Sequence, residues 1–100
     1  MKVNESLAEV LEEANLTENA IKKRKDIHAF YEGYHWNKLP KYRENLKKIT
    51  SLLWSLNQYN EAIEQYKILV DNNIQIFGET NIVTLKSKEN LAGYLSLIHI

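Results

Sequence analysis

The stretch that decides the fold is Leu53-Trp-Ser-Leu-Asn57-Gln-Tyr-Asn-Glu-Ala62-Ile63, because an earlier part of the chain repeats its pattern. Residues 11–21, LEEANLTENAI, align with it at an offset of 42 residues: both stretches begin with leucine, have asparagine fifth and end in Ala-Ile. The same offset brings Leu7, Ile49 and Leu91 into register. Self-similarity at a fixed period predicts a chain built from repeated structural units.

Within each unit, apolar residues recur every three or four positions, which is the period of an amphipathic helix. Asn15 and Asn57 interrupt this period, and asparagine tolerates the positive φ of a tight turn. Pro40 fits a first helical turn and marks the start of the third helix. Ala20 and Ala62 are small where two helix backbones approach closely. The predicted stripes are Leu7, Val10, Leu11 and Ala14; Ala20, Ile21, Arg24, Ile27, Tyr31 and Tyr34; Leu46, Ile49, Leu53 and Leu56; and Tyr59, Ala62, Ile63, Tyr66, Val70 and Asn73.

Three segments resemble a known repeat family. Residues 57–66, NQYNEAIEQY, resemble the second-helix signature of the tetratricopeptide repeat, and residues 46–53, LKKITSLL, resemble its first helix. Residues 77–92, FGETNIVTLKSKENLA, are similar to the glycine-containing connection and the Asn-Leu-Ala of the kinesin-light-chain type, whose period is longer than the usual 34 residues. The first unit departs from the family pattern, since Arg24 and Thr17 replace its aromatic residues.

This resemblance implies an all-α fold, an antiparallel helix-pair solenoid of about five helices. Residues 1–40 are the degenerate first helix pair, with an unrelated helical pair as the alternative. Residues 41–78 are the clear second pair, and residues 79–94 are the first helix of a truncated third repeat. Residues 95–100, LSLIHI, read like the translation of a sequencing adapter, so we interpret them as a non-native tail, with an ordinary apolar helix end as the alternative.

Composition excludes several classes of function. The chain has no cysteine, which excludes disulfides, thiol catalysis and thiolate metal sites. Its 13 basic and 13 acidic residues balance, so the chain as a whole is not a polycation.

We find no secretory signal and no apolar run long enough for a membrane span, and expect a cytoplasmic protein that does not bind membranes. With no phosphate-binding loop or nucleophile elbow, we predict no enzyme, no catalytic residue, no metal and no cofactor. His28 and His35 are two helical turns apart, too far to share a metal ion without further ligands.

The resemblance also implies a binding surface. Tetratricopeptide arrays bind extended peptides in a groove lined by the first helix of each pair, so we expect a non-catalytic scaffold for a peptide or protein partner. Trp54 follows the core residue Leu53 and is expected to be a partly exposed anchor. The amide of Asn90 can grip a peptide backbone through its donor and its acceptor. The expected groove residues are Ser6, Glu9, Lys47, Lys48, Ser51, Trp54, Ser55 and Asn90, with Glu5, Glu12, Glu13, Lys86 and Glu89 beside them.

The charge distribution leaves an alternative open. Residues 21–48 carry nine basic and three acidic residues, whereas residues 1–20 carry one basic and five acidic. Within 22–43, the run Lys22-Lys23-Arg24-Lys25 precedes several aromatic residues, a combination typical of surfaces that bind nucleic acids or other polyanions. The competing interpretation, which we favour, makes these aromatics core residues and the lysines a solvent-facing surface, so nucleic acid is not the expected partner. A further alternative is the regulatory array of a larger enzyme or transcription factor.

Overall fold

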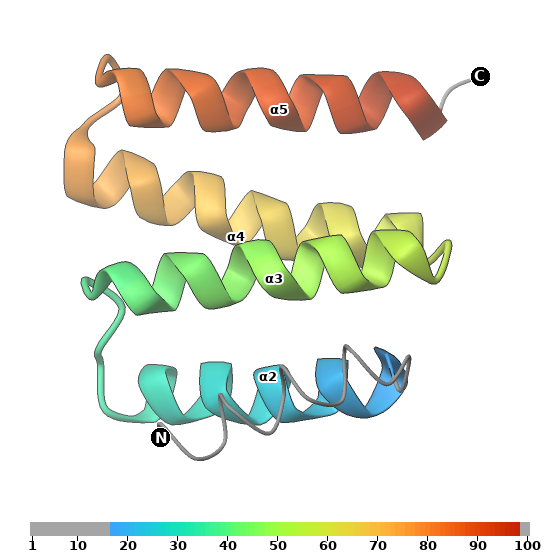
Figure 1. Ribbon diagram of the computed structural model, residues 1–100. Helices are drawn as coiled ribbons and strands as arrows, with labels where there is room; N and C mark the ends of the chain where they lie inside the picture. Colours follow the sequence, from blue (N-terminus) through green and yellow to red (C-terminus); the bar gives the residue numbers. More distant parts are fainter. Residues whose placement is uncertain (1–16, 99–100) are drawn as a thin grey trace.

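Four α-helices follow one another in the computed structural model, which describes residues 17–98 (Figure 1). They are α2 (Thr17–Gly33), α3 (Pro40–Ser55), α4 (Tyr59–Phe77) and α5 (Ile82–Ile98). No strand occurs among these residues, so the all-α prediction is confirmed. The helix expected before Asn15 and the turn at Asn15 lie outside the described residues. Within residues 17–98, no helix has the length and apolar character needed to cross a bilayer.

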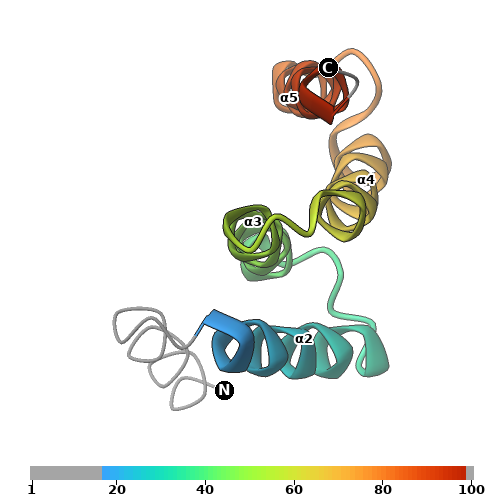
Figure 2. The same cartoon turned by 90° about the vertical axis from the view of Figure 1, so that its right-hand side faces the viewer.

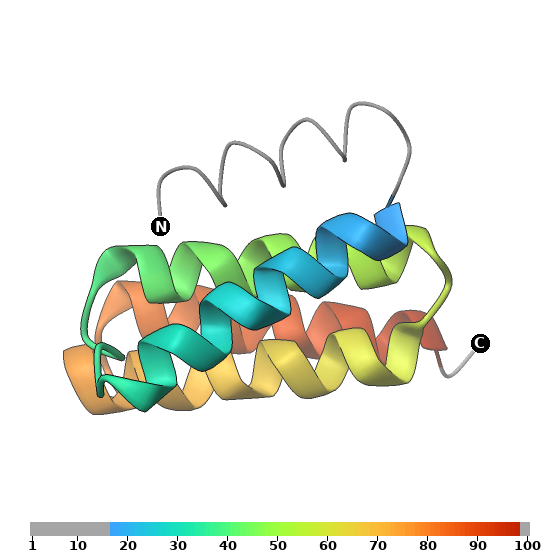
Figure 3. The same ribbon diagram turned by 90° about the horizontal axis from the view of Figure 1, so that it is seen from below.

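Consecutive helices run antiparallel and pack side by side (Figure 1). Seen end-on, α3 and α5 lie on one side of the row and α4 lies on the other (Figure 2). Viewed from below, α2 is inclined to the axes of the helices behind it (Figure 3). The closest backbone packing joins each helix to the next one in the sequence. Neighbours in the chain are therefore neighbours in space, and short connections suffice.

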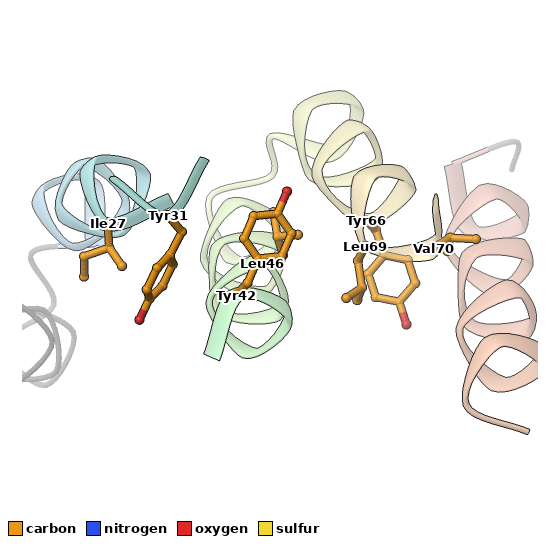
Figure 4. Packing of buried hydrophobic residues seen from close by; sticks show 7 residues of the cluster. All are labelled: Ile27, Tyr31, Tyr42, Leu46, Tyr66, Leu69 and Val70. Atoms are coloured by element: carbon orange, nitrogen blue, oxygen red, sulfur yellow. The ribbon is translucent and has the colours of Figure 1, made fainter. Parts of the chain in front are cut away.

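Two clusters of buried side chains hold the row together. The larger one, shown in Figure 4, joins α2, α3 and α4 through Ile27, Tyr31, Tyr42, Leu46, Tyr66, Leu69 and Val70. The smaller one lies toward the other end of α3 and consists of Ile21, Ile49, Leu53 and Ala62. Most of these residues belong to the predicted stripes; Tyr42 and Leu69 do not. Burying one large apolar side chain contributes about 1.5–3 kcal/mol, so α3 depends on both of its neighbours.

Asn57 closes α3 as predicted, with a positive φ of 62°. The N–H of Asn57 donates to the carbonyl of Trp54 (3.0 Å), and the N–H of Gln58 donates to the carbonyl of Leu53 (2.9 Å). These two bonds form a Schellman motif, which satisfies carbonyls that the helix end leaves unpaired. The Asn57 side chain also accepts a hydrogen bond from the hydroxyl of Tyr59 (2.7 Å), which links the turn to α4.

His35 closes α2 in the same way, a feature that the sequence did not reveal. Its φ is 58°; its N–H donates to the carbonyl of Glu32 (3.1 Å), and the N–H of Trp36 donates to that of Tyr31 (2.8 Å). Pro40 then begins α3 at its first turn, which confirms the predicted boundary. Leu39 before it is extended (φ −73°, ψ 140°), the conformation that a following proline favours.

Arg24 occupies a position in the α2 stripe where an apolar residue is expected, and it is nevertheless buried. Its guanidinium Nη1 donates to Oδ1 of Asn45 on α3 (3.3 Å), and the Asn45 amide Nδ2 donates back to the carbonyl of Arg24 (2.8 Å). A buried polar group without partners destabilises the fold; here the Arg24 side chain donates to the Asn45 side chain, which donates to the Arg24 backbone. The pair therefore fixes the register of α2 against α3.

Gly78 ends α4 at a positive φ of 86°, and Asn81 caps the start of α5 by accepting a hydrogen bond from the N–H of Val83 (2.9 Å). The hydroxyl of buried Thr84 donates to the carbonyl of Asn73 (3.1 Å) and joins α5 to α4. Helix α5 continues without a break to Ile98. Helical continuity does not reveal the origin of residues 95–100, so their assignment to a non-native tail stays a prediction.

Ala62→Leu is expected to lower the free energy of unfolding by about 1–3 kcal/mol, because Ala62 is fully buried against α2 and α3 and a larger side chain overpacks the contact. Ala92→Leu on α5 is the matched control, since Ala92 is exposed and leucine is well tolerated in helices. Urea unfolding of both variants checks this expectation. Equal stability of the two would contradict the close approach of helices at Ala62.

Tyr42→Phe is expected to make stability less sensitive to alkaline pH. Burial, together with the nearby Glu32 carboxylate, raises the pKa of Tyr42 to about 12. The folded state holds the proton of the Tyr42 hydroxyl more tightly than the unfolded chain does. The resulting contribution to the free energy of unfolding is therefore complete below pH 10 and is lost as the pH rises toward 12. Urea midpoints between about pH 8 and pH 12 should fall more steeply for the parent protein than for Tyr42→Phe; parallel curves would overturn the assignment.

Candidate functional site

The outer face of α3 carries three of the predicted groove residues. Lys47, Lys48 and Ser51 are exposed and share one side of the helix. Together with Glu44 and Leu52 they line an open surface hollow of about 560 Å³. Two ammonium groups, one carboxylate and one hydroxyl surround it, so this surface can hold a polar segment that offers both acceptors and donors.

The remaining predicted groove residues differ in whether their polar groups are exposed and free to bind a ligand. Ser55 is exposed, but its hydroxyl donates to the carbonyl of Leu52 on its own helix (2.7 Å). Lys86 and Glu89 are exposed on α5. The predicted residues of the first helix, Glu5, Ser6, Glu9, Glu12 and Glu13, lie outside the described residues.

Trp54 is half-buried, as the sequence predicted, and it packs between aromatic rings from two other helices. Its ring centroid lies 4.6 Å from that of Tyr59 on α4 and 4.8 Å from that of Tyr94 on α5. The Tyr94 ring in turn meets Tyr66 of α4 edge-on at 5.2 Å. We call Trp54, Tyr59, Tyr66, Tyr94 and the adjoining Asn90 the α3–α5 cluster, because it joins the two helices that lie on the same side of the row.

Asn90 is exposed at the edge of this cluster. Its amide Nδ2 lies 3.2 Å from the hydroxyl oxygen of Tyr66 and donates to it, which orients the side chain. The carbonyl oxygen Oδ1 has no hydrogen-bond donor among the described residues and can accept one from a peptide N–H. Burial raises the pKa of Tyr66, although the hydrogen bond from Asn90 lowers it, and the net shift is upward. The phenol is therefore neutral at physiological pH.

A second hollow, of about 580 Å³, opens beside Asn90 on α5. Its described lining residues are Glu89, Asn90, Gly93, Tyr94, Ser96 and Leu97. None of them lines the α3 hollow, so the predicted groove residues fall into two groups. Trp54 and Asn90 are brought together through the tyrosines, whereas Lys47, Lys48 and Ser51 face a separate hollow. The sequence signal missed the tyrosines because Tyr59 and Tyr66 were predicted as core positions of their own helix, and Tyr94 belonged to no predicted stripe.

The four residues of the basic run in α2, Lys22-Lys23-Arg24-Lys25, differ in burial and in their partners. Arg24 is buried against Asn45, and Lys25 forms an ion pair with Glu61 of α4. Lys22 is exposed and Lys23 is half-buried. A polyanion needs several cations along one path, and this arrangement leaves at most two of the four for such a path.

The aromatics of the same segment were interpreted as core residues, and for three of them this is wrong. Tyr31 is buried, but Phe30 is 37% exposed and Tyr34 is 59% exposed. Tyr34 leaves the α2 stripe because the helix ends at Gly33, so the residue follows the turn and not the helix. Trp36 is likewise exposed, at 42%. This second aromatic surface lies at the opposite end of α3 from Trp54.

The two histidines of this region are held separately. His28 Nε2 lies 2.7 Å from a carboxylate oxygen of Glu32, and the His28 ring packs on Tyr42 with centroids 5.0 Å apart. His35 is exposed in the turn after α2. Across residues 17–98, no three histidine, aspartate or glutamate side chains are grouped so that they could hold a metal ion.

Comparison of the chain with protein-family models, with curated proteins and with solved structures finds no match. Inferences about function therefore come from the geometry described above and from the internal repeat.

Trp54→Ala and Tyr94→Ala are expected to be coupled in their effects on stability. The two rings pack on each other across α3 and α5, and such aromatic pairs contribute about 0.5–1.5 kcal/mol beyond their buried area. A double-mutant cycle measured by urea unfolding gives this coupling directly. Trp54→Ala combined with Tyr34→Ala is the control: Tyr34 lies after the far end of α2, so these effects should add. Additivity in the first pair would show that the Trp54–Tyr94 contact carries no energy.

Proposed function

We propose that this chain is part of a tetratricopeptide-type helical solenoid of the kinesin-light-chain type, and that it acts as a non-catalytic scaffold. In this proposal it binds an extended peptide segment of a partner protein along α3 and α5. The observation that carries the proposal is the α3–α5 cluster, in which Trp54 of α3 and Asn90 of α5 are connected through tyrosines.

The burial pattern supports the repeat. Residues of α2 and α4 that are 42 positions apart are buried in step: Ala20 matches Ala62 and Ile21 matches Ile63. The same holds for the pairs Arg24 and Tyr66, Ile27 and Leu69, and Tyr31 and Asn73. Two helices that use equivalent positions for packing behave as equivalent units, which is the property that defines a repeat array.

The α3–α5 cluster also supports an extended peptide as the ligand. Extended peptides present alternating N–H and C=O groups, and a side-chain amide can bind such a backbone. In this site Oδ1 of Asn90 is available as an acceptor, while Nδ2 is held by Tyr66. The half-buried indole of Trp54 offers a flat apolar surface beside it, and tryptophan is the residue most enriched among strong binding anchors. Lys47, which lines the separate hollow on α3, would supply a cation to the part of the peptide that extends along that helix.

The regulatory-array alternative uses the same surface and differs only in what lies elsewhere in a longer protein. The polyanion alternative depends on the basic run of α2. The ion pair of Lys25 and the burial of Arg24 interrupt this run, so its four cations do not form one continuous surface. We therefore place the peptide scaffold first.

The proposal is tested by selecting peptides from a random library on the immobilised 100-residue protein and measuring their affinity by calorimetry. Asn90→Ala is expected to weaken a selected peptide by about two- to tenfold, since the hydrogen bond to a peptide N–H contributes about 0.5–1.5 kcal/mol. Lys88→Ala is the matched control, because Lys88 is exposed on the same helix but lines neither hollow.

Two results would contradict the proposal. One is a selection that enriches no sequence. The other is a set of peptides whose affinity is the same for the parent, Asn90→Ala and Trp54→Phe proteins, because such peptides would bind elsewhere. Urea unfolding of each variant separates a binding defect from a loss of fold.

A further inference from the structure

The outer face of α5 is not covered by any other helix of the described residues. Helix α5 is the last helix of the row, and among residues 17–98 its backbone packs closely only against α4 (Figure 1, Figure 2). Buried Thr84 and Ser87 mark the side that faces α4. Apolar side chains nevertheless occur on the other sides too, since Ile82 is 64% exposed and Leu85 is 47% exposed. A helix that is apolar all round is normally buried all round, so α5 lacks a partner on its outer face.

Four exposed residues follow one another along this outer face. Ile82, Lys86, Glu89 and Gly93 are separated by four, three and four positions, which is the spacing of the a and d positions of a coiled coil. At 3.6 residues per turn, the line that they form lies on the opposite side of the helix from Thr84. We call these four residues the α5 outer strip.

The order of residues in the α5 outer strip is complementary to itself. In reverse it reads glycine, glutamate, lysine, isoleucine, so an antiparallel second copy places its Gly93 opposite Ile82 and its Glu89 opposite Lys86. Both pairs have their midpoint between residues 87 and 88, so one twofold axis at this point forms each pair twice. Contacts with twofold symmetry, in which one surface binds the same surface of another copy, are the commonest kind in protein oligomers.

Charge and size both favour this pairing. Lys86 and Glu89 form no ion pair and no hydrogen bond within residues 17–98, so both charges are available to a second molecule. A β-carbon added to Gly93 would meet nothing within 4 Å, so the surface above this residue can receive the large side chain of Ile82. Glycine destabilises a helix interior, whereas it allows another chain to approach the backbone closely.

The other charges near the α5 outer strip do not oppose the pairing. Lys88 is the remaining charged residue of α5, and it lies about 160° away from Lys86 around the helix axis. Glu79 precedes α5, and the same twofold axis places it opposite the neutral Ser96 of the second copy. The Lys86–Glu89 pairs therefore dominate the electrostatics of this face.

We propose that the α5 outer strip binds the α5 outer strip of a second copy of this chain, which gives an antiparallel dimer with twofold symmetry. The paired charges select this arrangement, because parallel helices in register would place Lys86 opposite Lys86 and Glu89 opposite Glu89. One helix from each copy is a small interface, so we expect a weak and reversible dimer. The dimer forms without a peptide and is independent of the proposed function.

The first test measures self-association of the full 100-residue protein by sedimentation velocity at low salt. Lys86→Glu and Glu89→Lys should each weaken the dimer by about tenfold or more, because two attractive pairs become two repulsive ones. An equimolar mixture of the two variants should dimerise again, since one variant carries two glutamates on the strip and the other carries two lysines. Lys88→Glu is the matched control: it changes the net charge as Lys86→Glu does, but lies outside the strip.

The second test determines the register of the two helices. The chain has no cysteine, so a disulfide between introduced cysteines reports on one contact only. A mixture of Ile82→Cys and Gly93→Cys proteins should cross-link between unlike variants faster than within either variant. Like positions are separated by about 16 Å along the paired helices, since a helix rises about 1.5 Å per residue.

Three results would overturn the proposal. One is a parent protein that stays monomeric up to millimolar concentration, which would leave the outer face of α5 to a different partner. Another is a dimer that responds equally to Lys86→Glu and Lys88→Glu, because such a dimer would associate through other residues. The third is cross-linking that is faster within one cysteine variant than between the two. None of these measurements includes a peptide, so each outcome leaves the proposed function to its own test.

Discussion

Leu46 at the centre of α3 shows the constraint on which the rest of the structure depends. It is fully buried in a cluster that takes Ile27 from one neighbouring helix and Leu69 from the other. A helix of this length is marginal alone in water and gains its stability from packing an apolar face. Because α3 packs on two sides, α2 and α4 are positioned by the same helix, and α5 follows from α4 through Thr84 and Asn73. Every surface described above depends on this chain of contacts.

Two helix caps in the left-handed conformation determine where the aromatic surfaces lie. Asn57 ends α3 and directs the chain so that Trp54 and Tyr59 meet. His35 ends α2 and directs Tyr34 and Trp36 toward Phe30. The two caps have the same hydrogen-bond pattern but lie at opposite ends of α3. A chain with helices of similar length and two caps of the same kind thus presents two distinct aromatic surfaces, one joined across helices and one confined to a turn.

Polar side chains within the row set register where apolar packing alone would allow sliding. The mutual hydrogen bonds of Arg24 and Asn45 hold α2 against α3. The Asn72 amide donates to the carbonyl of Asn37 (2.8 Å) and ties α4 to the connection before α3. Directional bonds have one satisfactory geometry, and a shift by one residue would leave buried polar groups unpaired.

The sequence by itself determined the helical fold of the described residues, most of its core positions and the boundaries at Pro40 and Asn57. Spacing, proline and asparagine act on the local backbone, and local backbone preferences are written in adjacent residues. It also indicated that Trp54 is partly exposed. Only the tertiary structure decided that Trp54 packs on Tyr94, that the buried Arg24 donates to Asn45, and that Phe30 and Tyr34 are exposed. Periodicity identifies the buried face of one helix, but contacts between helices depend on how caps rotate one element against the next.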